Sequence, residues 1–213
     1  MATYNPDVFE LTDLESAKSI ILTDEAQVST QERWVTETPY LLAQLQQWCQ
    51  IEGAAQVLDF GCGIGRMSKA LIDATSACIW GIDVSQAMRA HAVSHVNNAR
   101  FAALSPQMLD AATQAGQRWN LALSVWVLQH CPDLNADIER LFAALKPGGV
   151  LFVVDMQHRA IPTVADGWVD DGLRVEPALR KRFNCLQMIP FTAPKAPANL
   201  LGSAWIGLFQ KPL

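Results

Sequence analysis

The chain has 213 residues, of which 50% are hydrophobic and 17% charged, so its composition is that of a globular protein and not of a disordered one. A net charge of −5 without any Lys/Arg run disfavours nucleic acid as a partner. Five scattered cysteines without CxxC spacing argue against a disulfide framework or zinc site, and an acidic N-terminus with only short apolar runs favours a cytoplasmic protein without a membrane span.

The N-terminal part of the chain predicts short helices. Residues 1–12 have no clear period and indicate a loose arm. Asp13 is placed to cap a short helix that runs to Leu22. A second helical stretch begins near Thr30, and Thr38-Pro39 is expected to restart it, because proline is tolerated in the first turn of a helix.

The most informative stretch covers residues 57–66. A short apolar run ends near Asp59 and breaks into three alternating glycines, followed by a helical pattern; the glycines are Gly61, Gly63 and Gly65. Strand, glycine turn and helix form the first half of a nucleotide-binding βαβ unit, where a ligand approaches bare backbone. A dinucleotide site would need a glycine where this chain has Arg66, and Asp59 suits a ligand that carries an ammonium group.

The rest of the chain alternates between strands and helices. The expected strands after the first are Cys78–Ile82, Arg100–Leu104, Trp119–Val125 and Val150–Val154. Helices are expected from Ser85 to Val96, from Pro106 to Ala115 and on the face marked by Ile138, Leu141, Phe142 and Leu145. This alternation implies a parallel, doubly wound sheet. Past Asp155 we expect a helix at 170–182, a strand at 183–189, a loop at 190–199 and a last strand at 203–210.

Four segments resemble, in order, the motifs of the class I S-adenosylmethionine-dependent methyltransferases. Val57–Gly65 resembles the first motif, and Gly81-Ile82-Asp83-Val84-Ser85 the second. Val125-Trp126-Val127-Leu128-Gln129-His130 resembles the segment after strand four in the branch related to quinone-biosynthesis methyltransferases. Leu145–Gly149 resembles the turn before strand five. The resemblance covers roughly residues 55–155.

This resemblance implies the fold and its division. We expect an α/β fold with a doubly wound, mostly parallel, seven-stranded Rossmann-like sheet whose antiparallel last strand is formed by the end of the chain. Residues 1–50 would form an N-terminal helical lid and residues 51–213 the domain that binds S-adenosyl-L-methionine, within one structural domain overall.

The resemblance also implies methylation of a small-molecule acceptor, at oxygen or nitrogen, by in-line displacement. A cofactor-binding protein without turnover, such as a regulatory partner, is an alternative. Another is an aminopropyltransferase-like enzyme, which would need carboxylates after strand four, where this chain has Ser124-Val125-Trp126.

The same resemblance implies a set of cofactor contacts. The glycine turn with Cys62 would line the methionine part, Asp83 would hold the ribose hydroxyls, and Val84 would pack against adenine. Arg33 is expected either to bind the cofactor carboxylate or to pair with Glu37 four residues on. Ser105 stands where the family usually has an acidic residue. The full expected set is Asp59, Gly61, Cys62, Gly63, Gly65, Asp83, Val84, Ser105, Val125, Arg33 and Trp34.

Candidate catalytic and acceptor residues follow strands four and five. His130 is the leading candidate for a general base, and the alternative is a hydrogen bond that holds its loop. Trp126, His158 and Trp168 are expected on the acceptor side; the alternative is plain packing for the two tryptophans and an ordinary polar loop for His158. His91 and His95 have the i, i+4 spacing of a metal pair but lack the Glu of HExxH and a third ligand, so no metal site is expected.

Overall fold

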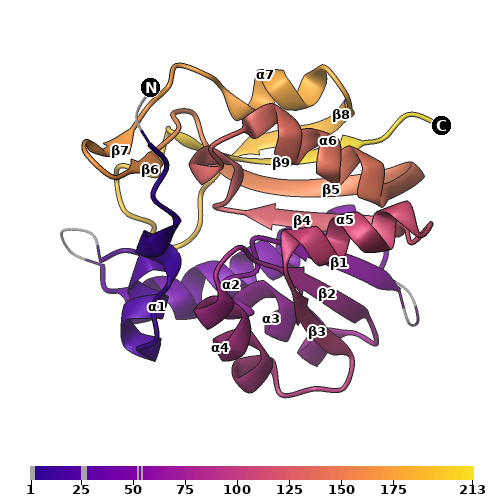
Figure 1. Ribbon diagram of the computed structural model, residues 1–213, viewed down its shortest axis with the longest axis horizontal. Helices are drawn as coiled ribbons and strands as arrows, with labels where there is room; N and C mark the ends of the chain where they lie inside the picture. Colours follow the sequence, from indigo (N-terminus) through magenta and orange to yellow (C-terminus); the bar gives the residue numbers. More distant parts are fainter. Residues whose placement is uncertain (1–2, 25–27, 52, 54) are drawn as a thin grey trace.

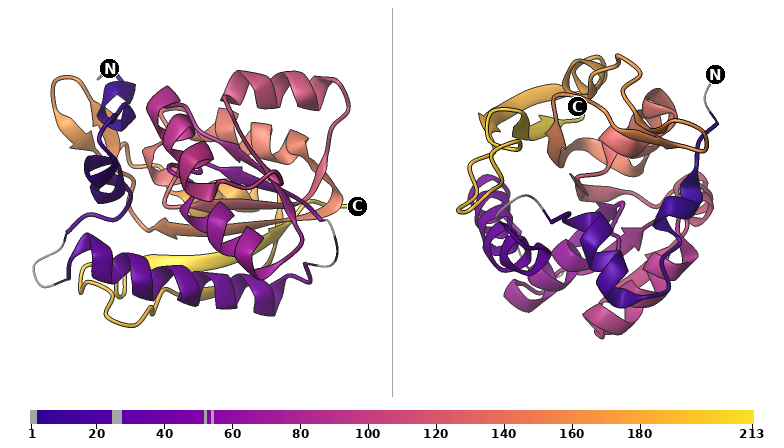
Figure 2. Two further views of the ribbon diagram at one scale, coloured as in Figure 1. Left: turned by 90° about the horizontal axis from the view of Figure 1, so that it is seen from below. Right: turned by 90° about the vertical axis from the view of Figure 1, so that its left-hand side faces the viewer.

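The computed structural model describes residues 3–24, 28–51, 53 and 55–213, and in it a central sheet carries helices on both faces (Figures 1 and 2). The sheet has seven strands in the order β3-β2-β1-β4-β5-β9-β8. Its strands are β1 Gln56–Phe60, β2 Cys78–Ile82, β3 Phe101–Leu104, β4 Trp119–Val125, β5 Leu145–Met156, β8 Asn184–Pro190 and β9 Ala204–Gln210.

The helices around this sheet include two short 3₁₀ segments. They are η1 Pro6–Phe9, α1 Leu14–Ile21, α2 Thr30–Trp48, α3 Arg66–Ala74, α4 Gln86–Val96, α5 Pro106–Gln114, η2 Leu128–His130, α6 Leu134–Ala144 and α7 Val175–Arg180. A separate hairpin consists of β6 Ile161–Thr163 and β7 Gly167–Val169. Within the described ranges, no helix is both long and apolar enough to cross a membrane.

The strand directions confirm the predicted α/β architecture. β1 pairs in parallel with β2 and β4, and β3 and β5 extend the parallel sheet on either side. β9, the last strand of the chain, runs antiparallel to both β5 and β8. The strand order reverses direction between β1 and β4, and ligands of such sheets bind outside the carboxyl ends of the strands at this point.

Side chains of the central strands alternate between two cores. On β1, Leu58 packs with buried residues of α5 and α6, whereas Val57 packs with buried residues of α2 and α3. Strands buried on both faces need the continuous apolar runs that the sequence shows at β4 and β5. This packing fixes the strand ends from which the candidate site is built.

The predicted restart of the second helix at Thr38-Pro39 is wrong. α2 is a single helix with Pro39 inside it. Its buried stripe, spaced four residues apart, continues across the proline and consists of Arg33, Glu37, Leu41 and Leu45. Packing of this stripe therefore outweighs the backbone hydrogen bond that proline removes.

The second half of α2 packs into the hydrophobic core. Leu41 and Leu45 are fully buried in the cluster beneath the sheet. The N-terminal arm and α1 lie instead at the end of the sheet, near the β6–β7 hairpin and α4 (Figure 1). Within residues 1–50, this arm, α1, Thr23 and Arg33 of α2 contribute to the lining of the candidate site.

Two further local predictions differ from the structure. The helix expected at 170–182 is shorter, because the carboxylates of Asp170 and Asp171 accept the amides of Gly172 and Leu173 and form turns before α7 begins. The β6–β7 hairpin was not predicted, and the arm at residues 1–12 contains η1 and a bridge from Tyr4 to Thr163.

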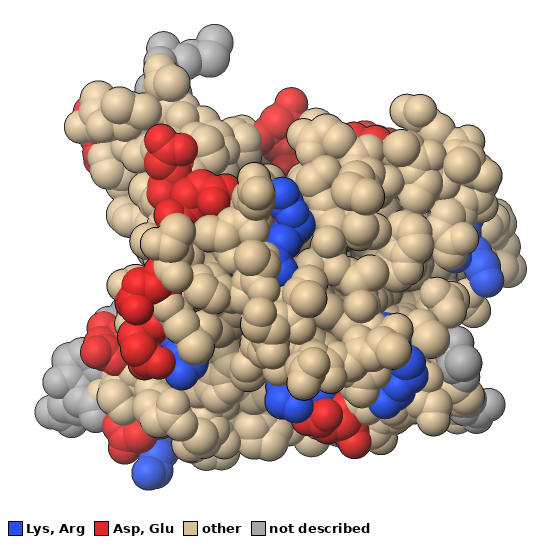
Figure 3. Space-filling view, turned by 60° about the horizontal axis from the view of Figure 1, so that its bottom comes forward, with Lys and Arg blue, Asp and Glu red and all other residues tan. Residues whose placement is uncertain are grey.

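Charged side chains are dispersed on the face shown in Figure 3. Basic side chains stand there in small groups among acidic and uncharged ones, and no continuous basic surface forms on that face. Elsewhere in the structure, oppositely charged side chains pair along one helix, as Lys69 does with Asp73 on α3. Such exposed pairs contribute little to stability.

Candidate functional site

A cavity of about 820 Å³ lies at the carboxyl ends of β1 and β4. Its wall brings together residues from the glycine turn, the end of β2, the segment after β4 and the N-terminal arm. The predicted site residues that line it are Arg33, Asp59, Gly61, Cys62, Gly63, Asp83, Val84, Val125, Trp126, His130, His158 and Trp168. Most of the residues predicted from the sequence therefore lie around one cavity, whose volume is typical of small-molecule binding sites.

Three predicted residues lie outside the cavity lining. Gly65 has a φ of +81° at the start of α3, and a Cβ there would lie 2.6 Å from Val96, so its role is in chain geometry and packing. Ser105 caps α5 through the amide of Met108. Trp34 packs against the ring of His95 and beneath the guanidinium of Arg66.

The glycine turn is held close to its surroundings. Gly61 has a φ of +75° and donates to the carbonyl of Ile82 over 2.7 Å. A Cβ on Gly61 would lie 2.3 Å from Val127. A Cβ on Gly63, whose φ is +53°, would lie 2.8 Å from Ile21 of α1. Glycine is therefore favoured at both positions by backbone conformation, and at Gly61 also by the close approach of Val127.

Two carboxylates stand on either side of this turn, Asp59 buried and Asp83 half-buried. Asp59 accepts the Ser68 hydroxyl over 2.6 Å, and desolvation raises its pKa to about 6. Asp83 accepts the amides of Gly63 over 2.8 Å and of Ser85 over 2.9 Å, and its pKa is also raised by desolvation. Both line the cavity, so a cationic or hydroxylated ligand would find acceptors here.

A cluster of buried arginines forms a second part of the wall. Arg33 donates to the Glu37 carboxylate over 2.7 Å and to the carbonyl of Thr23 over 2.9 Å. The predicted ion pair with Glu37 is thus present, but buried. Arg66 is 4% exposed and bonds the Thr38 hydroxyl, and its pKa is lowered to about 10, chiefly by desolvation.

Arg66 was not among the predicted site residues. Its signal in the sequence was its position, since it occupies the place of the third glycine of a dinucleotide site. Together with Arg33 it places two buried cations near two buried carboxylates, those of Glu37 and Asp59. Both arginines line the cavity, so an anionic group of a ligand would find cationic donors on this wall.

Both ring nitrogens of His130 are engaged within the protein. Nδ1 lies 2.5 Å from the carbonyl oxygen of Ala160, and Nε2 lies 2.9 Å from the side-chain nitrogen of Gln129. The Gln129 side-chain oxygen accepts the amide of Met156, which leaves its nitrogen as the donor to His130. Burial lowers the pKa of His130, so the neutral ring that donates through Nδ1 is favoured.

Aromatic rings surround this histidine. Trp168 lies 5.1 Å from the His130 ring and 6.1 Å from that of Phe9, between ring centroids. Trp126 has a φ of +62°, and its ring packs edge-on against Phe191 at 5.1 Å. His158 is exposed and bonds Asp170 instead of reaching deep into the cavity.

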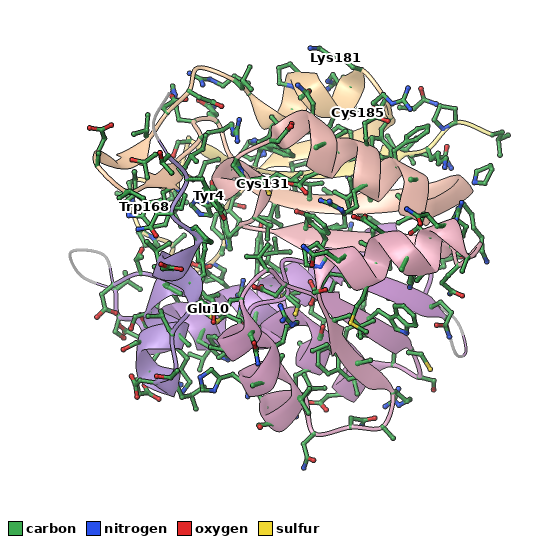
Figure 4. All side chains as sticks on the ribbon, viewed as in Figure 1. Tyr4, Glu10, Cys131, Trp168, Lys181 and Cys185 are labelled. Atoms are coloured by element: carbon green, nitrogen blue, oxygen red, sulfur yellow. The ribbon has the colours of Figure 1, made fainter. Side chains whose placement is uncertain are left out.

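The N-terminal arm contributes residues that the sequence did not indicate. Tyr4 and Phe9 both line the cavity. Figure 4 shows Tyr4 on the N-terminal segment of the chain. The pKa of Tyr4 is raised to about 12, first by desolvation and then by the nearby Cys131 and Asp137. Its hydroxyl therefore stays protonated at neutral pH and is available as a hydrogen-bond donor.

The sequence matches a family model described as "Methyltransferase domain" over residues 30–193. Among characterised relatives, it is 40% identical over 168 residues to trans-aconitate 2-methyltransferase of Variovorax paradoxus, covering 75% of this chain and 63% of the relative. It is 31% identical over 115 residues to ubiquinone biosynthesis O-methyltransferase of Coxiella burnetii, covering 54% and 48%. The chain thus spans about half to two thirds of these relatives.

Solved structures share the fold at low sequence identity. Phosphoethanolamine N-methyltransferase 2 of Haemonchus contortus aligns with a TM-score of 0.61 and 17% identity, covering 82% of this chain and 53% of that one. The [4+2]-cyclase SpnF aligns with a TM-score of 0.65 and 19% identity, covering 90% and 86%. Since the family model matches most of the sequence, the chain belongs to the methyltransferase domain family.

Proposed function

We propose that the protein transfers the methyl group of S-adenosyl-L-methionine to a small-molecule acceptor. The observation that carries this proposal is that one cavity joins the glycine turn and Asp83 to the acceptor-side residues Trp126, His130 and Trp168. A group transfer between two bound molecules needs such a shared space, which aligns the reacting atoms and excludes water.

The residues at the turn fit this cofactor. Asp83 would accept the ribose hydroxyls, and the exposed side chain of Val84 would pack against adenine. Asp59 would hold the ammonium group of the methionine part. When bound, the cofactor supplies a methyl group on a sulfonium, which is an activated leaving group.

The two arginines would hold the cofactor carboxylate. Arg33 reaches this wall from α2, and Arg66 from the first residue of α3. An anion between them would offset the desolvation of Arg66 that its lowered pKa reports. The ammonium and carboxylate groups of one amino-acid ligand would thus meet Asp59 and the arginines on neighbouring parts of the wall.

The acceptor is proposed to present an oxygen. Two relatives support this, one named for trans-aconitate and one for an O-methyltransferase step of ubiquinone biosynthesis. The protonated Tyr4 hydroxyl would donate to an oxygen acceptor. His130, with both nitrogens engaged, is proposed to orient the acceptor wall and not to act as the base.

The reaction is tested by mass spectrometry. The purified protein is incubated with S-adenosyl-L-methionine and one candidate acceptor at a time. The candidates are trans-aconitate, other small di- and tricarboxylic acids, and catechol-type phenols. We expect one acceptor to gain a methyl group with equimolar S-adenosylhomocysteine, and Asp83→Ala to form this product more slowly at a cofactor concentration below saturation. Binding without product from any acceptor would favour a non-catalytic cofactor-binding protein, and transfer of an aminopropyl group from decarboxylated cofactor would favour the aminopropyltransferase alternative.

A further inference from the structure

The N-terminal strap, defined as residues 3–11, crosses from the β6–β7 hairpin to α4 (Figures 1 and 2). At the hairpin end it adds a short antiparallel pairing. The amide of Asn5 donates to the carbonyl of Pro162 over 3.0 Å, and the amide of Val164 donates to the carbonyl of Thr3 over 2.9 Å. The strap thereby extends the hairpin by a third extended segment.

The other end of the strap is fixed by one carboxylate. Glu10 accepts the backbone amide of Gln86 over 2.7 Å and that of Ala87 over 3.1 Å. These amides belong to the first turn of α4, where the backbone donors have no partner within the helix. Ser85, the local cap, accepts the amide of Met88. Glu10 thus supplies, from 76 positions away, part of the capping that a helix start needs.

Glu10 is ionised when it makes these bonds. Desolvation alone would raise its pKa, but the amides of Ala87 and Gln86, with the Ser85 hydroxyl and the Arg89 charge, together lower it. The next residue, Leu11, makes a second contact with α4, because its carbonyl oxygen lies 3.1 Å from Nε2 of His91. The strap is therefore attached to α4 by polar contacts from two consecutive residues, Glu10 and Leu11.

Between its two ends the strap forms part of the cavity wall. Tyr4 and Phe9 line the cavity, and Phe9 packs against Trp168 and His130. The four residues of η1 include none that is buried. A segment with few buried contacts opens more readily than the core beneath it.

The first turn of α4, which Glu10 caps, directly follows Asp83 and Val84, the residues proposed to bind the nucleoside. The amide of Ser85, one residue before Gln86, donates to Asp83. Val84 lies between Asp83 and that turn and lines the cavity. Displacing Glu10 would therefore open the wall at Phe9 and loosen the turn that orients Asp83.

We propose that Glu10 is a positioning residue that latches the N-terminal strap over the cavity and so sets how fast a bound ligand leaves. This inference rests on the proposed function for the identity of the ligand. The latch itself depends only on contacts within the chain, so the two claims are tested separately.

The first test needs no ligand. Residue-specific amide hydrogen exchange is measured by NMR for Gln86 and Ala87 in the wild type, Glu10→Ala, Glu10→Gln and the control Glu15→Gln. Glu15 is an exposed acid on α1 that pairs with Lys18. We expect exchange at these amides to rise about tenfold or more in Glu10→Ala and less in Glu10→Gln, with Glu15→Gln unchanged. Equal exchange in all four proteins would overturn the latch.

The second test measures release of S-adenosylhomocysteine by stopped-flow tryptophan fluorescence. We expect release from Glu10→Ala to be several-fold faster than from Glu15→Gln, at a temperature well below the melting transition of both variants. Equal release rates would overturn the role in ligand retention. If the wild type bound no S-adenosylhomocysteine, the proposed function would fail, and the exchange measurement would still decide whether the latch exists.

Discussion

The amide of Gly63 donates a hydrogen bond to the carboxylate of Asp83 over 2.8 Å. This bond joins the glycine turn after β1 to the end of β2, the neighbouring parallel strand. The two halves of the proposed cofactor site are therefore positioned by each other before any ligand arrives. Such preorganisation reduces the ordering that a ligand must bring about.

Asp83 gives the first prediction. Asp83→Ala should weaken binding of S-adenosylhomocysteine by about 1–3 kcal/mol, because it removes a charged hydrogen-bond acceptor for the ribose and releases the Gly63 amide. Titration calorimetry measures this loss. Asp73→Ala, an exposed acid on α3, is the control. Equal affinity in wild type and Asp83→Ala would remove the ribose assignment.

The pH dependence of binding tests Asp59. Its pKa of about 6 lies above the usual carboxyl range because the group is desolvated. A bound ammonium favours the ionised carboxylate, so binding releases a proton below that pKa, and affinity should rise from about pH 5 to about pH 7. In Asp59→Asn this rise should vanish. Parallel pH profiles for the two proteins would place the ammonium group elsewhere.

Gly61 tests the close approach of the backbone to Val127. Gly61→Ala should lower the free energy of unfolding by about 1–3 kcal/mol more than Gly116→Ala does. Both glycines have positive φ, but a Cβ at Gly116 would meet nothing within 4 Å, whereas one at Gly61 would lie 2.3 Å from Val127. Chemical denaturation measures both variants. An equal loss at the two positions would show that Val127 moves aside.

Arg66 tests the proposed carboxylate subsite. Arg66→Met should weaken binding of S-adenosylhomocysteine by about tenfold, the effect of losing one charge-assisted contact. It should leave 5′-methylthioadenosine unaffected, because that ligand has the nucleoside but lacks the amino-acid group. Calorimetry with both ligands separates the two effects. A similar loss for both would indicate general damage to the cavity.

The sheet could be predicted from the sequence because its signals are local. The runs at Cys78–Ile82 and Trp119–Val125 match the observed strands, and each is bounded by turn or capping residues. The residues at the glycine turn were found for the same reason. Arg66 stands out in the sequence because it replaces the third glycine of a dinucleotide site. That replacement alone does not show that the arginine is buried in the wall of the cavity.

The strap could not be predicted, because its partners are distant in the sequence. Glu10 caps a helix 76 positions away, and Tyr4 pairs with Thr163. Neither contact produces a hydrophobic periodicity in the neighbouring sequence from which it could be predicted. The engagement of His130 by Gln129 and Ala160 likewise depends on how the segments after β4 and β5 meet. Long-range packing decided these features.

The central claim is that the cavity binds S-adenosyl-L-methionine, and calorimetric titration with S-adenosylhomocysteine tests it most directly, with NAD as the control ligand. We predict saturable binding of S-adenosylhomocysteine at one site and no binding of NAD. If S-adenosylhomocysteine did not bind, or if NAD bound equally well, the assignment of the glycine turn, Asp59 and Asp83 to this cofactor would be contradicted.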